Sequence, residues 1–539
     1  MKPLDEHNPI FVAVLFLLAT VALFLNLGLE PLHFEEPRRA IVALEMELTG
    51  NWWVPKINGE FYYNKPPIYN WLLIVLFKLF GYEEWVTRLP SVLSLIAIAV
   101  INFFFFRTRI GEKAALIVSI FWLTSADLLF YFSFQGEIDL FYTLIVYLQV
   151  LAIFYYFDKG KFWQLFLLSY LLCGLGFLTK GLPSLAFQAL TIFGLLAYRK
   201  RFWTLFHPAH FAGIALLSLM LGGFFWKYSM YNDQLPYIVR LISESTNRTA
   251  VGDQSLWRSI QHLFEFPLML LKLLSPWVIL IIWARKGLTK NHLLGNPWIL
   301  YSLIFIGINL PLYWLSAGTR ERYLYMFLPF LFNVLAFGLN NQLSAKSLHR
   351  TLAIITSIIS IGALAIPFIH QLEQIDGRIF IMLMLTLGSG FISYLLYSSR
   401  HHPVLVFAAF MLLLRIGFDL LVLPVRSEKR RHENYETYAE QVTEATQGAA
   451  VALSVPVETV YYPIPFTSDS IAYRDVKWPP YQLSYYLSSL NGAVLDNQAS
   501  ESSEWVLRDV QVEPTENTEE AMRVDIPSKG RSFILERRD

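Results

Sequence analysis

The feature that most constrains this chain is a series of long apolar runs. Each run has about 17 to 25 residues, which is the length a helix needs to cross about 30 Å of hydrocarbon. Only 16% of the 539 residues are charged, whereas soluble domains average about 25%. The sequence therefore predicts a mainly α, polytopic membrane helix bundle. The thirteen expected spans lie near 9–29, 88–106, 114–134, 139–157, 162–178, 182–198, 209–230, 263–283, 296–316, 323–340, 351–370, 379–398 and 403–424.

The short loops predict an orientation. Basic residues recur in alternate connections, and such loops stay on the cytoplasmic side of a membrane. The first run follows MKPLDEHNP, which is as acidic as it is basic, and has no small-residue cleavage site after it, so we expect a retained span. The N-terminus is then cytoplasmic and the C-terminus lies outside. The loops that carry the signal contain Arg107, Arg109 and Lys113, Lys159 and Lys161, Arg199, Lys200 and Arg201, Arg285, Lys286 and Lys290, Lys346 and Arg350, and Arg400.

Two regions outside the membrane are expected to be structured. The first outer loop, residues 30–87, mixes charged residues with tryptophan, tyrosine and phenylalanine, a composition that suits an interfacial segment. After Pro424 the composition changes to charged, helix-like and short strand-like segments. We expect residues 1–424 to form the transmembrane domain and residues 425–539 to form a small soluble α/β domain. About 115 residues are enough for such a domain to build its own core.

Composition excludes several kinds of site. Cys173 is the sole cysteine, so a disulfide within the chain is impossible and a cysteine metal site is not expected. The last 115 residues show no metal-ligand spacing, phosphate-binding loop or nucleophile elbow. A net charge of +1 gives no sign of a nucleic-acid partner.

Charged residues gather at the predicted outer ends of the spans, where charge is costly unless it is paired or functional. Glu35 and Glu36 stand beside Arg38 and Arg39 in the first loop. Asp139, two residues after Glu137, begins the fourth span; capping of that helix is the alternative explanation for this carboxylate. A single basic residue at a helix end is usually a snorkelling anchor. Several on one face predict a cradle for a phosphate group, and here they are Lys65, Lys180, Arg248, Arg320 and Arg322.

The order of these motifs resembles a known family. An acidic pair with a nearby arginine is followed by NWWVP, Tyr-x-Lys-Pro, RLPSVL, TKG and SAGxRxxYLxxxLP. This order is similar to that of the bacterial lipid A aminoarabinose transferases and the wider group of protein O-mannosyltransferases, which are GT-C type membrane glycosyltransferases. The resemblance covers about residues 1–425 and is strongest in the first loop and around 316–330. It implies an enzyme that takes a sugar from a polyprenyl-phosphate carrier and transfers it on the outer face of the inner membrane.

The resemblance assigns roles to particular residues. Glu35 and Glu36 match the family's acidic pair, of which the first is proposed as catalytic, and Asp139 matches its second essential carboxylate. Lys65 matches the lysine that reaches the donor phosphate, and Arg38 matches the arginine that follows the pair. The first acidic position is usually aspartate, so the longer glutamate side chain leaves open which member of the pair is catalytic.

The positions linked to a bound metal in the aminoarabinose enzyme differ in this chain. They read Asn64 and Ser245 instead of glutamate and histidine. We therefore expect transfer without a metal or other cofactor. A rearranged site built on His33 and Glu35 is the alternative.

The chemistry is coherent without the family. Lysine and arginine can stabilise polyprenyl phosphate as a leaving group, and a carboxylate can act as general base for an acceptor hydroxyl. A single displacement gives inversion at the anomeric carbon, since a retaining enzyme normally needs a nucleophile. The sugar stays open among aminoarabinose, mannose and galactosamine, and the acceptor between a lipid, such as lipid A, and a protein. A transporter or flippase of a lipid-linked sugar is the main alternative function, and a membrane scaffold that binds a partner is the third.

Overall fold

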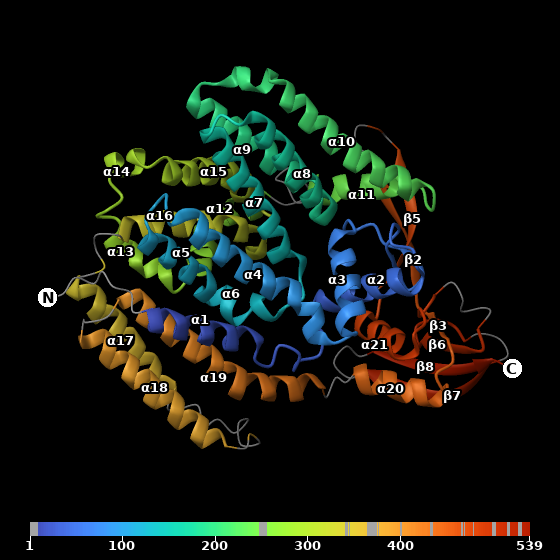
Figure 1. Ribbon diagram of the computed structural model, residues 1–539. Coiled ribbons are helices and arrows are strands. Elements are labelled where there is room, and N and C mark those ends of the chain that lie inside the picture. Colours follow the sequence, from blue (N-terminus) through green and yellow to red (C-terminus); the bar gives the residue numbers. More distant parts are fainter. Residues whose placement is uncertain are drawn as a thin grey trace.

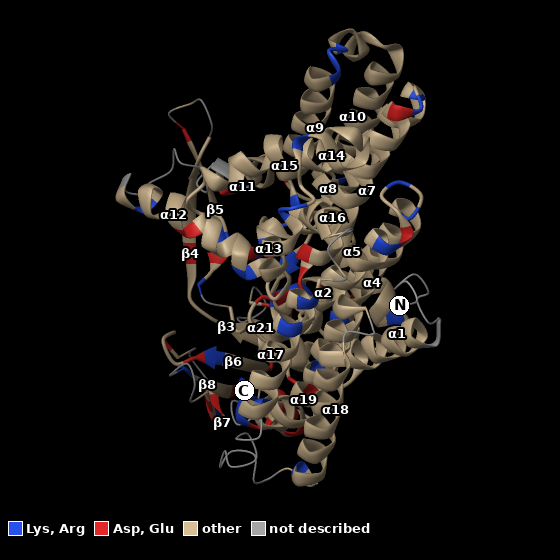
Figure 2. Cartoon of the chain, turned by 90° about the vertical axis from the view of Figure 1, so that its left-hand side faces the viewer, with Lys and Arg blue, Asp and Glu red and all other residues tan. Residues whose placement is uncertain are grey.

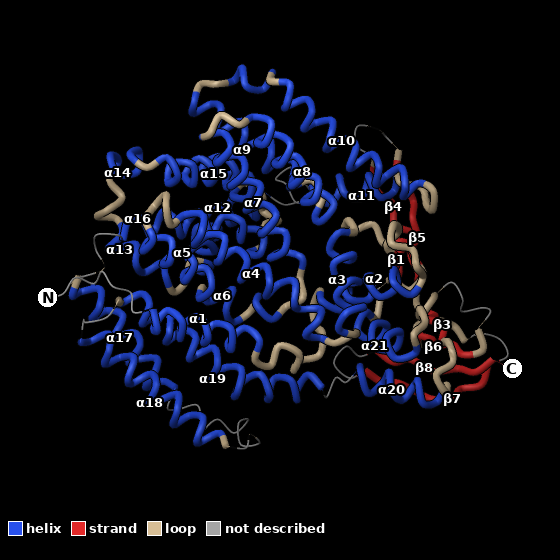
Figure 3. The backbone as a smooth tube through the Cα atoms, viewed as in Figure 1, coloured by secondary structure: helices blue, strands red, loops and turns tan. Residues whose placement is uncertain are grey.

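The chain folds into a large helical body with a mixed helix and strand region on one side (Figures 1 and 3). The computed structural model describes residues 9–246, 256–339, 343, 345–363, 375, 377–398, 402–431, 435–464, 467, 469–477, 479–497, 503–514, 518–526 and 531–538. This architecture confirms the predicted fold class, a membrane helix bundle with a structured first loop and a small C-terminal sheet region.

The helical body supplies the membrane spans. In the described part of the chain, eight helices are long and apolar enough to cross a membrane, or up to ten if each of two bent pairs counts as one span. The expected number of thirteen is therefore not confirmed, and α1 and α9 are short, at 16 and 17 residues. The helices of the body are α1 (Pro9–Phe24), α4 (Glu84–Phe106), α5 (Glu112–Thr124), α6 (Ala126–Phe130), α7 (Ile138–Asp158), α8 (Phe162–Lys180), α9 (Pro183–Arg199), α10 (Pro208–Ser229), α12 (Leu256–Leu273), α13 (Ile281–Ala284), α15 (Pro297–Trp314), α16 (Leu328–Leu339), α17 (Lys346–Ala363), α18 (Arg378–Ser398) and α19 (Pro403–Arg431).

Short helices connect these elements. They are η1 (Phe132–Phe134), η2 (Phe202–Phe206), α11 (Leu235–Thr246), η3 (Trp277–Leu280), α14 (Lys290–Gly295) and η4 (Glu321–Phe327). Colouring by charge leaves most of the long helices uncoloured along their lengths, as expected for segments in contact with lipid (Figure 2).

Two predicted spans are broken, and their breaks meet. The segment 112–134 bends by 42° between α5 and α6, and the segment 257–284 bends by 93° between α12 and η3. The Ser125 hydroxyl donates to the Leu273 carbonyl at 2.7 Å, and the Ala126 N–H donates to the Ser275 carbonyl at 2.8 Å. Each break therefore supplies partners for backbone groups that the other leaves outside a helix.

The first outer loop contains more structure than its sequence predicted. It holds α2 (Glu36–Leu48), the hairpin of β1 (Lys56–Ile57) and β2 (Glu60–Phe61), and α3 (Ile68–Phe80), a short apolar helix that was not expected. Asn58 and Gly59 form the hairpin turn with φ angles of 52° and 78°, the left-handed geometry of a two-residue turn. A Cβ on Gly59 would meet the Asp496 carboxylate at 2.0 Å, so the C-terminal region packs directly on this turn.

The C-terminal region begins inside α19, because that helix continues past the predicted boundary at Pro424 to Arg431. Its sheet has the order β3–β6–β8–β7, in which β3 and β6 are parallel and the other pairs are antiparallel. A separate hairpin of β4 and β5 reaches α11 and β2 (Figure 1). The bounds are α20 (Tyr435–Ala445), β3 (Val451–Ser454), β4 (Val457–Pro463), β5 (Ser470–Val476), α21 (Tyr481–Asn491), β6 (Trp505–Asp509), β7 (Thr518–Ile526) and β8 (Arg531–Arg538).

The first outer loop and the C-terminal region share one hydrophobic core. Ile41 and Leu44 of α2 and Leu73 of α3 belong to the same buried cluster as Leu483 of α21 and Leu535 of β8. Figure 1 shows α21 between α2 and the sheet. The loop that carries the predicted acidic pair is thus held in place by residues about 450 positions later.

Candidate active site

The acidic pair at the start of α2 separates into two environments. Glu35 is the residue before the helix, and its side chain is 26% exposed. Its carboxylate forms an ion pair with Arg38 and lies 3.8 Å from the Arg39 guanidinium. Pro37 follows at the start of α2, where a missing N–H costs nothing. Glu35 therefore keeps a partly open carboxylate beside two cations of its own helix.

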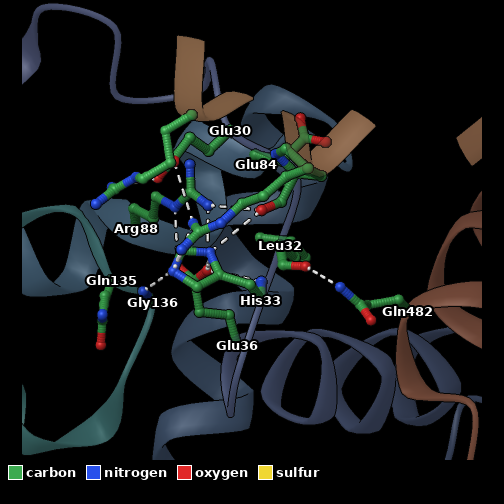
Figure 4. Close-up of polar contacts among 12 residues, drawn as sticks. Glu30, Leu32, His33, Glu36, Glu84, Arg88, Gln135, Gly136 and Gln482 are labelled. Atoms are coloured by element: carbon green, nitrogen blue, oxygen red, sulfur yellow. Dashed lines mark hydrogen bonds and ion pairs between the residues drawn. The ribbon is translucent and has the colours of Figure 1, made fainter. Parts of the chain in front are cut away.

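Glu36 is fully buried and its carboxylate has four donors (Figure 4). Arg88 of α4 donates to both oxygens, at 2.8 and 3.1 Å, while the backbone N–H groups of His33 and Gly136 donate at 3.0 and 2.6 Å. Burial alone would raise the pKa of Glu36, but the charge of Arg88 and the side-chain hydrogen bonds from Arg88 and His33 hold it below its usual range. The contacts tie the first loop to α4 and to the segment before α7.

A second acidic cluster forms at the N-terminal end of α7. Asp139 is 2% exposed and accepts from Lys180 of α8 at 2.5 Å, and the Arg322 guanidinium lies 3.8 Å from its other oxygen. Glu137 is also buried and forms an ion pair with Arg322. Asp139 thus meets side chains of two other elements and does more than cap its own helix.

Glu137 is a site residue that the sequence analysis noted but did not select. Burial and the neighbouring charge of Asp139 raise the pKa of Glu137 above its ordinary value, although Arg322 and Arg39 partly offset this. Its place two residues before Asp139, next to the predicted start of a span, was the available signal.

Arg39 lies between the two acidic clusters. It is 5% exposed, donates to the Tyr62 hydroxyl at 2.8 Å and stands near Glu35. Burial would lower the pKa of Arg39, but Tyr62, Glu137 and Asp139 raise it. The guanidinium is therefore within electrostatic range of the second acidic cluster as well. The spacing of four residues from Glu35 along a helix was the sequence signal for this contact.

Lys65 and Lys180 line one cavity. Its volume is about 210 Å³, and most of its remaining wall is apolar or aromatic. Lys65 also contacts both oxygens of Glu244 in α11, at 2.8 and 2.9 Å, and the Lys180 ammonium lies 4.7 Å from the centre of the Tyr323 ring. The other lining residues are Tyr142, Leu182, Pro183, Ala186, Leu241, Leu312, Tyr313, Ser316, Gly318, Thr319 and Met326. Two predicted phosphate-binding lysines are therefore brought together, at a wall suited to a lipid chain.

The remaining predicted basic residues are placed differently. Arg322 belongs to the acidic cluster, and Arg320 is exposed just before η4. Arg38 does not line the cavity of the two lysines; it lines a smaller polar cavity with Asn64 and Arg240. Arg248 falls outside the described residues.

The described residues contain no group of three or more His, Cys, Asp or Glu side chains that could hold a metal. Asn64 lines the small polar cavity, and the side chain of Ser245 is outside the described part. His33 faces Glu36 at 3.2 Å and Arg430 at 3.0 Å. The alternative site of His33 with Glu35 therefore has no support in these contacts.

Comparisons with known proteins agree with this geometry. Residues 64–226 match the family model described as dolichyl-phosphate-mannose-protein mannosyltransferase. An undecaprenyl phosphate-alpha-4-amino-4-deoxy-L-arabinose arabinosyl transferase of Aeromonas hydrophila is 25% identical over 301 residues, 54% of this chain and 52% of that protein. The protein of the same name from Serratia proteamaculans is 27% identical over 334 residues, 58% of this chain and 57% of that protein. The matched part is thus just over half the length of these relatives.

The fold has a counterpart among solved structures. ArnT from Cupriavidus metallidurans bound to undecaprenyl phosphate has a TM-score of 0.69 with 18% identity, over 98% of both chains. The likeness includes the C-terminal region, beyond the residues in which the sequence resemblance was seen. The resemblance to aminoarabinose transferases and protein mannosyltransferases is confirmed.

Proposed function

We propose that this chain is an inverting membrane glycosyltransferase that moves a sugar from a polyprenyl-phosphate carrier to a lipid or protein acceptor. The observation that carries the proposal is the cavity lined by Lys65 and Lys180, in which two ammonium groups, the first paired with Glu244, stand beside a largely apolar wall. A polyprenyl phosphate needs both features, since its phosphate is anionic and its chain is apolar. Lys180 also contacts Asp139, so the cavity adjoins the acidic cluster.

Each residue has a task in the proposed reaction. The acceptor oxygen attacks the anomeric carbon and forms the new glycosidic bond, while the bond from that carbon to the phosphate oxygen breaks. The electron pair leaves with the polyprenyl phosphate, whose charge Lys65 and Lys180 stabilise. A hydroxyl acceptor gives its proton to the carboxylate of Glu35, which is more open than that of Glu36. Asp139 accepts a hydrogen bond from the Lys180 ammonium and so orients Lys180.

The location follows from the same assignments. The multi-pass membrane character rests on the apolar helices and the matched fold. We place the site on the outer face of a bacterial inner membrane, with the N-terminus cytoplasmic and the C-terminal region outside. The basic short loops support this orientation. The names of the relatives support a polyprenyl-phosphate sugar as the donor. An acceptor such as lipid A is the partner that the family resemblance implies.

The test uses purified full-length protein and a panel of polyprenyl-phosphate sugars. Release of polyprenyl phosphate together with a glycosylated acceptor supports the proposal, and EDTA should leave the rate unchanged. Glu47→Gln is the matched control for Glu35→Gln, because Glu47 lies on the same helix at the far end from Glu35. A flippase would move the lipid-linked sugar from one leaflet of a vesicle membrane to the other without releasing polyprenyl phosphate. That result would overturn the proposal.

A further inference from the structure

A larger cavity lies where three parts of the chain meet. It has a volume of about 310 Å³ and is bordered by the first outer loop, the end of α19 and the C-terminal region. The Gln482 side chain of α21 donates to the Leu32 carbonyl at 2.7 Å beside it (Figure 4). Its lining consists of Pro31, His33, Phe34, Pro37, Arg430, Tyr435, Pro479, Pro480, Tyr481, Gln482, Ile526, Arg531 and Phe533. None of these residues lines the cavity of Lys65 and Lys180.

The charge of this lining has one sign. It contains Arg430 and Arg531 and, among the described residues, no acidic side chain. Arg531 is anchored from the side by Asp509, and Arg430 is anchored by Glu30 at 3.1 Å. Both guanidiniums are thus held at the wall of the cavity by carboxylates that are not among its described lining residues. Fixed guanidiniums of this kind suit the oxygens of a phosphate.

The Arg430 guanidinium has N–H groups beyond those used in its contacts with Glu30 and His33. In the described part of the chain, only its Nη1 atom has partners, the Glu30 carboxylate and His33 Nε2. Because Arg430 can only donate, His33 Nε2 accepts, and His33 Nδ1 carries the proton that faces Glu36 at 3.2 Å. The Nε and Nη2 groups of Arg430 remain for a ligand.

The cavity lies at the depth of lipid headgroups. The helix that contains the apolar part of α19 has 28 residues from Pro403 to Arg430, so it is about 42 Å long, whereas hydrocarbon is about 30 Å thick. Arg430 at its end is therefore beyond the hydrocarbon. Phe34 adds an aromatic ring that is 65% exposed on the cavity wall, and its φ of 54° is rare for a bulky residue. An exposed aromatic ring at this depth is typical of contact with lipid.

We propose that this cavity binds the anionic phosphate headgroup of a membrane lipid. Arg430 and Arg531 contact the phosphate oxygens, and Phe34 lies along the glycerol and the start of the acyl chains. A bound lipid would join the membrane end of α19 to the C-terminal region. The inference concerns binding at this cavity and does not depend on the proposed transfer reaction.

The test measures the thermal unfolding midpoint of the full-length protein in a neutral detergent during titration with phosphatidylglycerol. A saturable rise is expected for the wild type, because a ligand that binds the native state stabilises it. Phosphatidylcholine, which has no net charge, should give a clearly smaller rise. Arg430→Gln should weaken the apparent affinity about tenfold, and Arg531→Gln, an independent variant from β8, should weaken it as well. Arg430→Lys should retain part of the response.

Arg426→Gln is the matched control. Arg426 lies one turn earlier on α19 and also pairs with Glu30, but it does not line the cavity. It should keep the wild-type response even if its own midpoint is lower. An unchanged response in both Arg430→Gln and Arg531→Gln would overturn the proposal. If inorganic phosphate alone reproduces the rise, the lipid assignment is wrong and the cavity binds a free anion.

Discussion

Glu35 and Glu36 are adjacent in the chain, but their surroundings give them different properties. Sequence patterns identified the pair as important and left open which member acts in catalysis. The contact that distinguishes them is with Arg88, which is 52 positions away on another helix. No local pattern predicts that pairing. In contrast, Lys180 and Asp139 could be selected from sequence because each charge stands at the end of a long apolar helix. Lys65 was selected with them from the first outer loop, where it stands in the Tyr-x-Lys-Pro motif.

The first prediction separates the two carboxylates. Glu35→Gln should lower transfer by about 10²- to 10⁴-fold, the usual contribution of a general base, with an unchanged unfolding midpoint. Glu36→Gln should instead destabilise the fold by about 3–5 kcal/mol, since it leaves Arg88 buried without its counter-charge. Parallel turnover and thermal unfolding measurements check this. Equal loss of midpoint in both variants would contradict the division of roles.

The second prediction concerns Lys65. Lys65→Ala should weaken donor binding, and the remaining affinity should depend less on salt than that of the wild type, since an ammonium–phosphate contact is partly Coulombic. Titration of donor at several ionic strengths measures both effects. Lys227→Ala, at the last turn of α10 and outside the cavity, is the control. Unchanged affinity for Lys65→Ala would leave the residue as an interfacial anchor only.

The third prediction concerns pH. The pKa of Glu137 is raised in the folded protein, so the native state binds this proton more tightly than the unfolded state does. Its contribution to stability is complete below the ordinary carboxyl pKa and is lost as pH rises through the raised pKa. The wild type should therefore lose more stability than Glu137→Gln between pH ~5 and ~8. Unfolding midpoints across this range give the difference, and parallel curves for the two proteins would refute it.

At the scale of elements, apolar length predicted where helices occur but not how they bend. The segment 112–134 reads as one span, yet it breaks at Ser125, whose hydroxyl bonds to the break beside Leu273. A one-dimensional pattern does not contain this reciprocal contact. The apolar stretch before Tyr82 forms α3, which the sequence analysis included in the first outer loop because 13 residues are too few for a membrane span.

The fourth prediction tests a buried ion pair within α19. Arg415 and Asp419 are both fully buried, 2.7 Å apart, and Arg415 also donates to Ser133 at 2.8 Å. Arg415→Leu should destabilise the protein by about 3–5 kcal/mol, because Asp419 is left buried without its partner. The double variant with Asp419→Leu should recover part of this loss. Unfolding free energies of the wild type, the two single variants and the double variant, all measured in one detergent, complete the double-mutant cycle. If the two single losses of stability simply add in the double variant, the residues are not coupled.

At the scale of the whole molecule, the C-terminal region is less independent than its composition suggested. Its length is sufficient for a separate core, but its buried residues form one cluster with α2 and α3. Sequence composition identifies a soluble segment and cannot say which surface it packs on. The described structure supplies that surface, through contacts such as that of the Asn58 side chain with Ser484 at 2.9 Å.

The fifth prediction follows from the shared core. Leu483 is fully buried between α21 and the first loop, so Leu483→Ala should cost about 2–5 kcal/mol. Donor transfer should fall with it, although the residue touches neither lysine of the cavity. Leu490→Ala, on the same helix and 49% exposed, is the control and should change stability little. A loss of stability confined to the C-terminal region, with transfer intact, would show that the two parts fold separately.

The shared core also sets an order for biogenesis. Ribosomes make the first outer loop early, and its helices α2 and α3 enter their compartment with apolar side chains that the C-terminal region helps to cover in the folded protein. Some 350 residues must be synthesised and inserted between the two halves of this core. The acidic pair therefore reaches its final geometry only after the last strand has arrived, and a prematurely terminated chain presents uncovered apolar helices to the quality-control proteases.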